Sequence, residues 1–210
     1  MLERDEYVRG VRRMAVERGR VVTGIDNDRL LAAAASGDQH AWEMLVDRYA
    51  DLVWSVARSF RLGPADAADV SQTTWLRLVE HLTDIRDSDR LGAWLATTAR
   101  REALTVLRRS GHIVPTGDAW RLDLPDPVAE PLDGALLRTE SAVGVRRAFV
   151  QLSQRCQQLL RVLLADPAPS YAEVGAALGM PIGSIGPARA RCLDGLRRRL
   201  AHQEGQLDGR

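Results

Sequence analysis

Apolar residues recur at intervals of three and four along the first half of the chain, from Asp26 to Arg109. The stretch Trp42–Phe60 follows this spacing most closely, which predicts a single amphipathic helix with one buried face. Asp38 lies just before this stretch, where its carboxylate can cap the first turn of the helix. The apolar positions of this helix are Trp42, Leu45, Val46, Tyr49, Leu52, Val53, Val56 and Phe60.

Three more helices are predicted in the same half of the chain. Asp28–Ala35 forms a short first helix, and Gly63-Pro64 ends the long helix and starts another, since proline suits a first helical turn. The polar bridge Thr83–Ser88 separates that helix from a fourth. The expected inward residues are Val70, Thr74, Leu78, Val79 and Leu82, followed by Leu91, Trp94, Leu95, Thr98 and Val106. Residues 26–110 therefore predict a four-helix domain, without any strand pattern.

The periodic pattern stops between Ser110 and Gly134, where prolines, glycines and acids are scattered. Composition of this kind is typical of an extended connection rather than a packed unit. The segment carries five acids against Arg121 alone. They are Asp118, Asp123, Asp126, Glu130 and Asp133. We therefore predict an acidic linker over residues 111–138, and we expect an N-terminal extension over 1–25.

Helical spacing resumes in a second predicted domain, residues 139–202, which a short tail of residues 203–210 follows. Two amphipathic segments open it, with Ser153 as the expected cap of the second. Their apolar positions are Val145, Ala148, Phe149 and Leu152, then Leu159, Leu160, Val162, Leu163 and Leu164. Asp166-Pro-Ala-Pro169 ends the second segment. The fold class is therefore all-α, with two small helical domains joined by the linker.

A capping box opens the last part of this domain, because Ser170 and Glu173 can each bond an unpaired amide at a helix start. The helix Tyr171–Leu178 then ends at Gly179, which suits the left-handed conformation at a helix end. Ser184 is expected to cap the next helix, with Pro187 in its first turn, where a missing amide costs little.

A helix, a tight glycine turn and a basic helix form the helix-turn-helix arrangement, in which the second helix enters the DNA major groove. The second helix carries Arg189, Arg191, Arg197, Arg198 and Arg199 against Asp194. Arg189 and Arg191 are the better candidates for base contact, while the other three would meet phosphates or solvent. The alternative is a plain antiparallel helix pair with a solvated arginine face.

The net charge of the 210 residues is only +1. The distribution of charge along the chain is more informative, because basic and acidic residues are concentrated in different segments. The stretch Arg90–Arg109 has five arginines against Glu102, and the acidic linker separates it from the second basic helix. No apolar run is long enough to span a bilayer and the N-terminus lacks an apolar signal core, so we expect a cytoplasmic protein without membrane contact.

Metal and cofactor chemistry has little support in the sequence. Cys156 and Cys192 are far apart, outside any metal-binding spacing, and predict two buried ordinary thiols. The four histidines are scattered, and no phosphate-binding glycine loop is present. We therefore expect no metal, no cofactor and no catalytic residues, and an enzyme is the least favoured alternative.

Three segments resemble, in order, the regions of bacterial sigma factors of the extracytoplasmic-function (ECF) type. Tyr171–Leu193 (YAEVGAALGMPIGSIGPARARCL) resembles the last DNA-binding region of that family. Asp66–Leu78 (DAADVSQTTWLRL) resembles its polymerase-binding helix, and Trp94–Arg109 (WLATTARREALTVLRR) its promoter-melting helix. The resemblance extends over most of the chain from Asp26 to Leu200.

The resemblance implies that the first domain is sigma region 2 and the second is sigma region 4, in a protein that initiates transcription without being an enzyme. Its partners would be core RNA polymerase, through the clamp helices of the largest subunit and the flap of the second subunit, and promoter DNA both duplex and melted. The linker would run toward the polymerase active-site and RNA-exit region. An anti-sigma protein is a further partner that is common in the family.

The residues implied fall into three sets. The polymerase-binding set is Asp66, Asp69, Gln72, Thr73 and Trp75. The minus-ten set, for the melted strand, is Arg90, Trp94, Thr98, Arg100, Arg101, Arg108 and Arg109, with the loop Leu82–Asp89 before them. The minus-thirty-five set, for duplex DNA, is Ser184, Ile185, Gly186, Pro187, Arg189 and Arg191.

Simpler interpretations remain open for several of these residues. Asp66 and Asp69 suit a helix start by charge alone, and the arginines could form a solvated face. Trp94 is expected to be mainly a core residue, and Trp75 less so. The sequence departs from the family at Gly186-Pro187-Ala188, where Ala188 stands in place of the customary arginine and Arg189 is the substitute. A stand-alone helix-turn-helix repressor or activator is the alternative function, although it leaves the first domain without a purpose.

Overall fold

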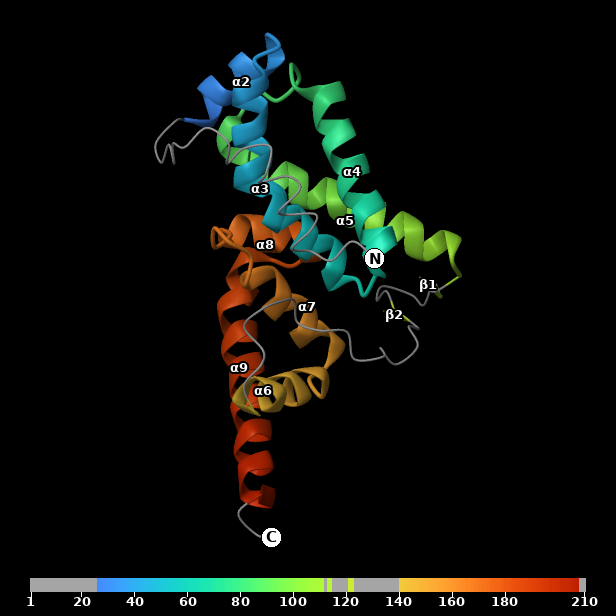
Figure 1. Cartoon of the computed structure of the whole chain (residues 1–210), viewed down its shortest axis with the longest axis vertical. Coiled ribbons are helices and arrows are strands. Elements are labelled where there is room, and N and C mark those ends of the chain that lie inside the picture. Colours follow the sequence, from blue (N-terminus) through green and yellow to red (C-terminus); the bar gives the residue numbers. More distant parts are fainter. Residues whose placement is uncertain (1–25, 112, 115–120, 123–139, 208–210) are drawn as a thin grey trace.

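The computed structural model describes residues 26–111, 113–114, 121–122 and 140–207, and its architecture is all-α, as predicted (Figure 1). The helices are α2 (Asn27–Ala35), α3 (Gln39–Ser59), α4 (Pro64–His81), the 3-10 turn η1 (Ser88–Arg90), α5 (Leu91–Arg109), α6 (Glu140–Val150), α7 (Gln154–Leu163), α8 (Tyr171–Leu178) and α9 (Ile182–Leu207). We call α2–α5 with η1 the N-terminal group and α6–α9 the C-terminal group.

Short capping contacts define where the predicted helices begin. The Asp38 carboxylate accepts from the amides of His40 and Ala41, at 2.9 and 3.2 Å, and so caps α3. The Ser153 hydroxyl accepts from the amide of Cys156 at the start of α7, and Pro64 occupies the first turn of α4. These three sequence predictions are confirmed.

The helix-turn-helix is also confirmed in its first helix and its turn. Ser170 and Glu173 form the reciprocal capping box of α8, and Gly179 ends that helix with φ of 63°. Gly175 lies against the turn, since a Cβ there would be only 2.9 Å from the Met180 carbonyl oxygen. A side chain at this position would therefore push the turn away from α8.

The second helix of the motif begins earlier than the sequence suggests. It starts at Ile182, so Ser184 is not its cap, and the Ser184 hydroxyl instead donates to the Pro181 carbonyl at 2.7 Å. Pro187 consequently lies beyond the first turn, inside the helix, where it leaves the Gly183 carbonyl without its usual amide. The helix continues through Pro187 and past residue 202 to Leu207.

Three apolar residues expected to face inward are exposed. Val79 on α4 is 53% exposed, and Leu164 is 69% exposed because it is the residue after the last turn of α7. Val145 on α6 is exposed as well. Each lies at the edge of an otherwise correct apolar stripe, where one helical step turns a side chain out of the core.

The predicted linker is described only in part. Ile113–Val114 (β1) pairs antiparallel with Arg121–Leu122 (β2), a short ladder that the sequence pattern did not predict. The acids of the linker and the predicted N-terminal extension lie outside the described residues.

The two cysteines do not remain separate thiols, which corrects the sequence prediction. Cys156 on α7 and Cys192 on α9 form a disulfide, with their Cα atoms 5.3 Å apart. Their 36-residue separation hid this proximity, since α7 and α9 meet only once α8 and its turn have folded between them.

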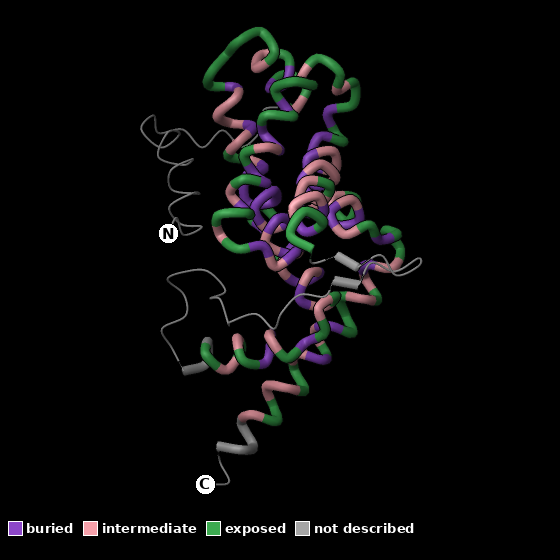
Figure 2. The backbone as a smooth tube through the Cα atoms, turned by 90° about the vertical axis from the view of Figure 1, so that its right-hand side faces the viewer, coloured by how far each residue is buried: buried purple, intermediate pink, exposed green. Residues whose placement is uncertain are grey.

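One continuous apolar core joins the two groups. Figure 1 shows α8 beneath α3 and α5, with α9 running down from it to the C-terminus, and the buried positions in Figure 2 continue from one group into the other. In the N-terminal group α3 lies between α2, α4 and α5. Among the described helices, none is both long and apolar enough to cross a membrane.

Candidate nucleic-acid and polymerase surfaces

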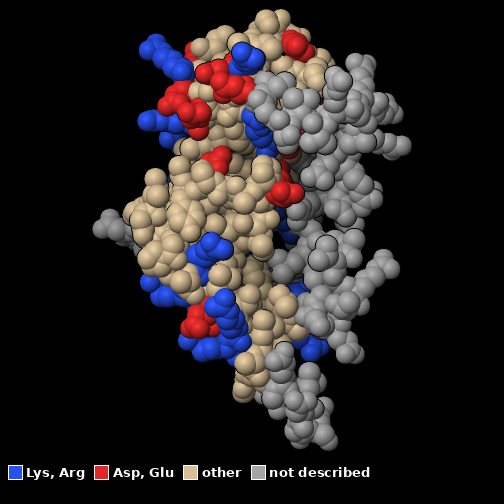
Figure 3. Space-filling view, turned by 90° about the vertical axis from the view of Figure 1, so that its left-hand side faces the viewer, with Lys and Arg blue, Asp and Glu red and all other residues tan. Residues whose placement is uncertain are grey.

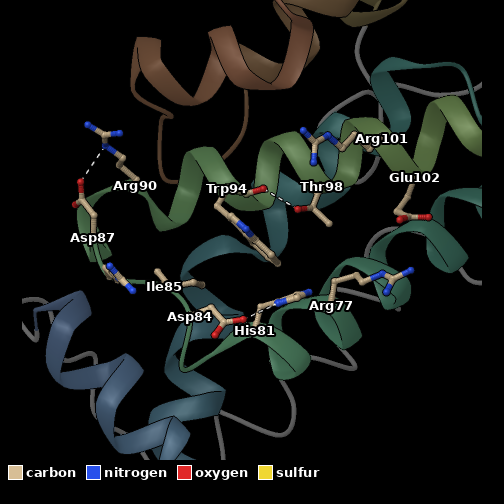
Figure 4. Close-up of a pocket in the computed structure, with 11 residues that line it drawn as sticks. Arg77, His81, Asp84, Ile85, Asp87, Arg90, Trp94, Thr98, Arg101 and Glu102 are labelled. Carbon is tan, nitrogen blue, oxygen red and sulfur yellow. Dashed lines mark hydrogen bonds and ion pairs between the residues drawn. The ribbon is translucent and has the colours of Figure 1, made fainter.

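A pocket of about 620 Å³ opens between the end of α4, the loop after it and the first three turns of α5. Figure 4 shows Trp94 and Thr98 directed from α5 toward α4 and His81, with Arg90 and Arg101 pointing outward at the edge of the pocket. Four arginines, one histidine, three acids, one tryptophan and two further residues line it. They are Arg77, Arg86, Arg90, Arg101, His81, Asp84, Asp87, Glu102, Trp94, Ile85 and Thr98. We call it the α4–α5 pocket.

Trp94 forms the aromatic wall of this pocket. Its ring lies edge-on to the His81 ring, with centroids 6.2 Å apart and planes inclined by 63°. The Thr98 hydroxyl donates to the Trp94 carbonyl oxygen at 2.9 Å, one turn further along α5. Because residues 90, 94, 98 and 101 fall on one side of a helix, α5 presents a basic and aromatic face here.

Two close side-chain contacts lie at the rim of the pocket. Arg90 Nε lies 2.9 Å from Asp87 Oδ2, and His81 Nδ1 lies 3.0 Å from Asp84 Oδ2. All four side chains are largely exposed, so the pairs orient the side chains more than they stabilise the fold. The pocket lining has four arginines against three acids, so its charge is nearly balanced and a ligand would compete with the acids for the arginines.

The remaining predicted minus-ten residues lie elsewhere on α5. Arg108 and Arg109 are exposed in its last turn. Arg100 points toward α8, where its guanidinium lies against Gly179. Burial lowers the pKa of Arg100, and the nearby positive charge of Arg101 lowers it further. The seven residues of this set are thus divided between the pocket, the helix end and the contact with α8.

The outward side of α4 carries a separate stripe of exposed residues, Asp69, Gln72, Leu76 and Val79, which we call the α4 stripe. Asp66 is exposed just before it, and Thr73 is half-buried beside it. Leu76 is 56% exposed and was missed by the sequence interpretation, although it falls outside the buried positions Val70, Thr74 and Leu78. Exposed apolar residues flanked by polar ones are typical of protein contact surfaces.

The two predicted tryptophan roles are exchanged in the structure. Trp75 is only 8% exposed and packs edge-on against Trp42, with ring centroids 6.2 Å apart. It therefore supports the α4 stripe from inside the core. Trp94, expected mainly in the core, is half-buried and lines the pocket.

The predicted minus-thirty-five residues do not share one surface. One lies in the core, and the others lie on the outward side of α9 or on the two flanks beside it. Ile185 is fully buried and packs near Gly175, so it belongs to the core of the helix-turn-helix. Arg189 lines a shallow hollow with Gly186 and Tyr171, whereas Arg191 lines another hollow with Ser184 and the disulfide. Pro187 is exposed between these two flanks. Residues two apart on a helix differ by about 200° in direction, so the two arginines flank the outward side.

Charge is unevenly spread over the face seen in Figure 3, with acidic side chains mainly in its upper part and arginines gathered in its lower part, where α9 runs. Over the described ranges, no group of three or more His, Cys, Asp or Glu residues could hold a metal ion.

Comparisons with known proteins agree with this geometry. Residues 45–113, from the middle of α3 to β1, match the family model of sigma-70 region 2. The chain is 30% identical over 180 residues to RNA polymerase sigma factor CnrH of Cupriavidus metallidurans, which covers 79% of this chain and 92% of that protein. ECF RNA polymerase sigma factor SigM of Mycobacterium tuberculosis is 28% identical over 185 residues, covering 87% and 86%.

A solved structure of CnrH in complex with the cytosolic domain of CnrY has the same fold, with a TM-score of 0.54 and 25% sequence identity. The superposition covers 84% of this chain and 99% of that one, so it includes both helical groups. The chain therefore belongs to the extracytoplasmic-function family of RNA polymerase sigma factors, which act in transcription initiation.

Proposed function

We propose that this sigma factor captures an unstacked base of the minus-ten element in the α4–α5 pocket while α9 reads the minus-thirty-five element as duplex. The observation that carries the proposal is the pocket itself, in which one tryptophan and four arginines surround a space of about 620 Å³. A volume of this order can receive a single nucleobase with its sugar.

The pocket chemistry suits a melted strand. A flipped base gains about 1–3 kcal/mol from stacking on an aromatic side chain, and Trp94 offers such a surface. Asp84, Asp87 and Glu102 can accept hydrogen bonds from base amino groups, while Arg77, Arg86 and Arg101 can contact phosphates. The acids also disfavour loose binding of duplex backbone, because they repel phosphates.

The C-terminal group suits duplex DNA. Arg189 and Arg191 project to either side of the exposed Pro187–Ala190 segment, so a groove that received α9 would meet an arginine on each side. Arginine can bond guanine in two places or bind a phosphate, and only the first of these contacts specifies sequence. We infer that Arg189, near Tyr171, has the reading role.

We further propose that the α4 stripe docks on the clamp helices of the largest polymerase subunit and that the C-terminal group meets the flap of the second subunit. The stripe joins a carboxylate and an amide to two exposed apolar side chains, which suits a partner helix with basic and apolar positions. By analogy with CnrH, solved with the cytosolic domain of CnrY, we expect an anti-sigma protein as a further partner.

Reconstitution with core polymerase tests the function directly. We expect the chain to start RNA at a defined subset of genomic sites, mapped by sequencing of transcript 5′ ends. The purified chain alone should shift promoter duplex only weakly, whereas a stand-alone repressor or activator would bind it tightly. Tight specific binding without polymerase would favour that alternative.

The docking surface is tested by Leu76→Asp, which should weaken association with core polymerase about tenfold, measured by fluorescence anisotropy. Asp69→Ala should likewise weaken association with core polymerase, and the effect should be the same at every promoter. Leu164→Asp is the matched control, because Leu164 is also an exposed leucine but follows the last turn of α7, away from α4. Normal binding by both α4 variants would show that the surface has been misplaced.

A further inference from the structure

The bond between Cys156 and Cys192 lies in the lining of a hollow of about 330 Å³ on one flank of α9. The start of α7 and the turn before α9 complete the hollow, which we call the cysteine hollow. Of the described residues that line it, two are basic and none is acidic, whereas four arginines and three acids line the α4–α5 pocket. The two basic residues are Arg155 and Arg191. The cysteine hollow is therefore positively charged.

The two cysteines are not equally accessible from this hollow. Cys192 is only 5% exposed and belongs to the apolar core, whereas Cys156 is half-buried in the first turn of α7. Arg155 and Arg191, the sequence neighbours of the two cysteines, are both exposed. A reagent that enters the hollow therefore reaches the sulfur of Cys156 more easily than that of Cys192, and it does so beside two positive charges.

This setting favours one class of reagent. A disulfide bond is cleaved by a thiolate, which attacks one of the two sulfurs and displaces the other. Positive charge beside the sulfurs attracts an anionic thiol and stabilises both the attacking and the leaving thiolate. A space of about 330 Å³ can receive a thiol the size of a short peptide, such as glutathione with its two carboxylates.

The compartment in which a sigma factor works supplies such a reagent. A sigma factor works beside RNA polymerase, where small thiols keep most cysteines reduced, and a disulfide bond that forms there is usually transient or redox-sensing. The Cys156–Cys192 bond is therefore a better candidate for exchange with these thiols than for a permanent cross-link.

Cleavage of the bond changes a helix that the proposed function assigns to duplex DNA. Cys192 directly follows Arg191, so the bond ties the Arg191 flank of α9 to α7. Ser184 and Ala188, two turns and one turn earlier on the same flank, line the same hollow. Without the bond, only non-covalent packing holds this flank, and α9 has more conformational freedom to lose when it binds DNA.

We propose that the cysteine hollow is a thiol-exchange site for a small anionic thiol of the glutathione class, through which the surrounding thiols set how tightly α9 binds the minus-thirty-five element. The thiolate attacks Cys156 Sγ and forms a new S–S bond there, while Cys192 leaves as a thiolate and takes up a proton. A second thiolate attacks the outer sulfur of this mixed disulfide, so Cys156 in turn leaves and is protonated. Two thiol molecules are oxidised to one disulfide, and the protein gains two thiols.

The exchange itself is tested on the oxidised full chain with three thiols at equal thiolate concentration: anionic glutathione, neutral 2-mercaptoethanol and cationic cysteamine. Mass spectrometry after an acid quench should find the first glutathione on Cys156. Arg155→Glu should slow exchange with glutathione about fivefold, change exchange with 2-mercaptoethanol less than about twofold and accelerate exchange with cysteamine. Arg147→Glu is the matched control, because it makes the same change of charge at an exposed arginine of α6 that does not line the hollow.

The effect on DNA is tested with factor that has been treated with glutathione and freed of it before assembly with core polymerase. The oxidised factor should give a holoenzyme that binds a minus-thirty-five duplex about fourfold more tightly than the reduced factor does. Affinity for a single-stranded minus-ten DNA should not change. The double variant Cys156→Ser with Cys192→Ser should behave like the reduced factor in both assays and should not respond to the thiol.

Equal rates of glutathione exchange in the wild type and in Arg155→Glu would overturn the site, as would a first glutathione on Cys192 or no exchange at all. Equal duplex affinity of the oxidised and reduced factor would overturn the regulatory role, and so would an equal loss of duplex and strand binding. Only the effect on DNA rests on the proposed function. Exchange rates need neither polymerase nor DNA, so a polymerase that failed to start RNA would count against the proposed function and leave the exchange site standing.

Discussion

Both α5 and α9 are rich in arginine, but the two helices differ in how they are packed. α5 has neighbours on several sides, so its arginines are divided between a pocket, a helix end and the contact with α8. α9 contacts its group along one side, and its arginines project into solvent around the other. Similar composition therefore yields a site that can enclose a single base in one helix and a surface that can enter a groove in the other.

The groups also differ in how they are held together. Long helices of the N-terminal group bury a large set of leucine, valine and aromatic side chains around α3. The C-terminal group has shorter helices before α9 and adds the Cys156–Cys192 bond between α7 and α9. A small helical unit gains more from such a bond, because its own core is limited.

Reduction of this bond should produce the largest effect. Closing a loop of 36 residues contributes about 4 kcal/mol through the unfolded state, so reductant should lower the free energy of unfolding of the C-terminal group by up to that amount. The N-terminal group should change little. Hydrogen–deuterium exchange with and without dithiothreitol would show faster exchange in α7 and α9 but not in α3.

The double variant Cys156→Ser with Cys192→Ser is the control for this experiment, since it should exchange like the reduced protein and ignore the reductant. Equal exchange in the oxidised and reduced wild type would mean that the bond adds nothing to the stability of the group.

Removal of the aromatic wall of the pocket should have the next largest effect. Trp94→Ala should reduce promoter opening by about 2 kcal/mol, roughly thirtyfold, if one base stacks on the indole ring. Fluorescence of 2-aminopurine placed in the minus-ten strand would report the opening. Trp94→Phe should retain most of it, and Trp94→Ala should leave binding of a minus-thirty-five duplex unchanged.

An intact opening signal in Trp94→Ala would remove the pocket from the mechanism. Loss of duplex binding in the same variant would mean instead that the substitution had disturbed α5 and, through it, the C-terminal group.

Local signals in the sequence predicted much of this architecture. Asp38, Ser153, Pro64 and the Ser170–Glu173 box each act within one helical turn, so their effect can be read from neighbouring residues alone. The helix-turn-helix followed from the same kind of evidence.

Tertiary proximity was less accessible from the sequence. The pairing of Cys156 with Cys192 and the cover of Arg100 by Gly179 depend on how separate helices pack, which periodicity does not encode. Trp75 and Trp94 show the same limit within one domain: both are apolar residues on amphipathic helices, and only the packing of α4 on α3 and α5 decides which one is buried.

The arginines on the flanks of α9 should have moderate and separable effects. Arg189→Ala should cost about 1–2 kcal/mol at promoters with a good minus-thirty-five element and relax base preference at one position. Arg191→Ala should weaken all sequences alike, by about 0.5–1 kcal/mol, if it meets a phosphate. Because they lie on different sides of α9, the two effects should add in the double variant.

Filter binding of holoenzyme to duplexes with single base-pair changes would separate the two roles. The reverse outcome, with base preference lost in Arg191→Ala alone, would assign reading to the flank beside the disulfide. Strong non-additivity would mean that the two arginines share one contact.

The smallest effect is expected at Asp194, which pairs with Arg198 one turn later on α9 at 2.5 Å. Both side chains are mostly exposed, so Asp194→Ala should change the free energy of unfolding by no more than about 0.5 kcal/mol. The same change removes a negative charge from an arginine-rich helix and should strengthen non-specific duplex binding about twofold at low salt, steepening its salt dependence.

Glu102→Ala on α5 sharpens the contrast, because Glu102 lines the pocket and its loss should alter strand binding rather than duplex binding. A salt titration of both variants against duplex and single-stranded probes would check this. If both variants changed duplex and strand binding in the same way, α5 and α9 would not have the separate DNA-binding roles proposed for them.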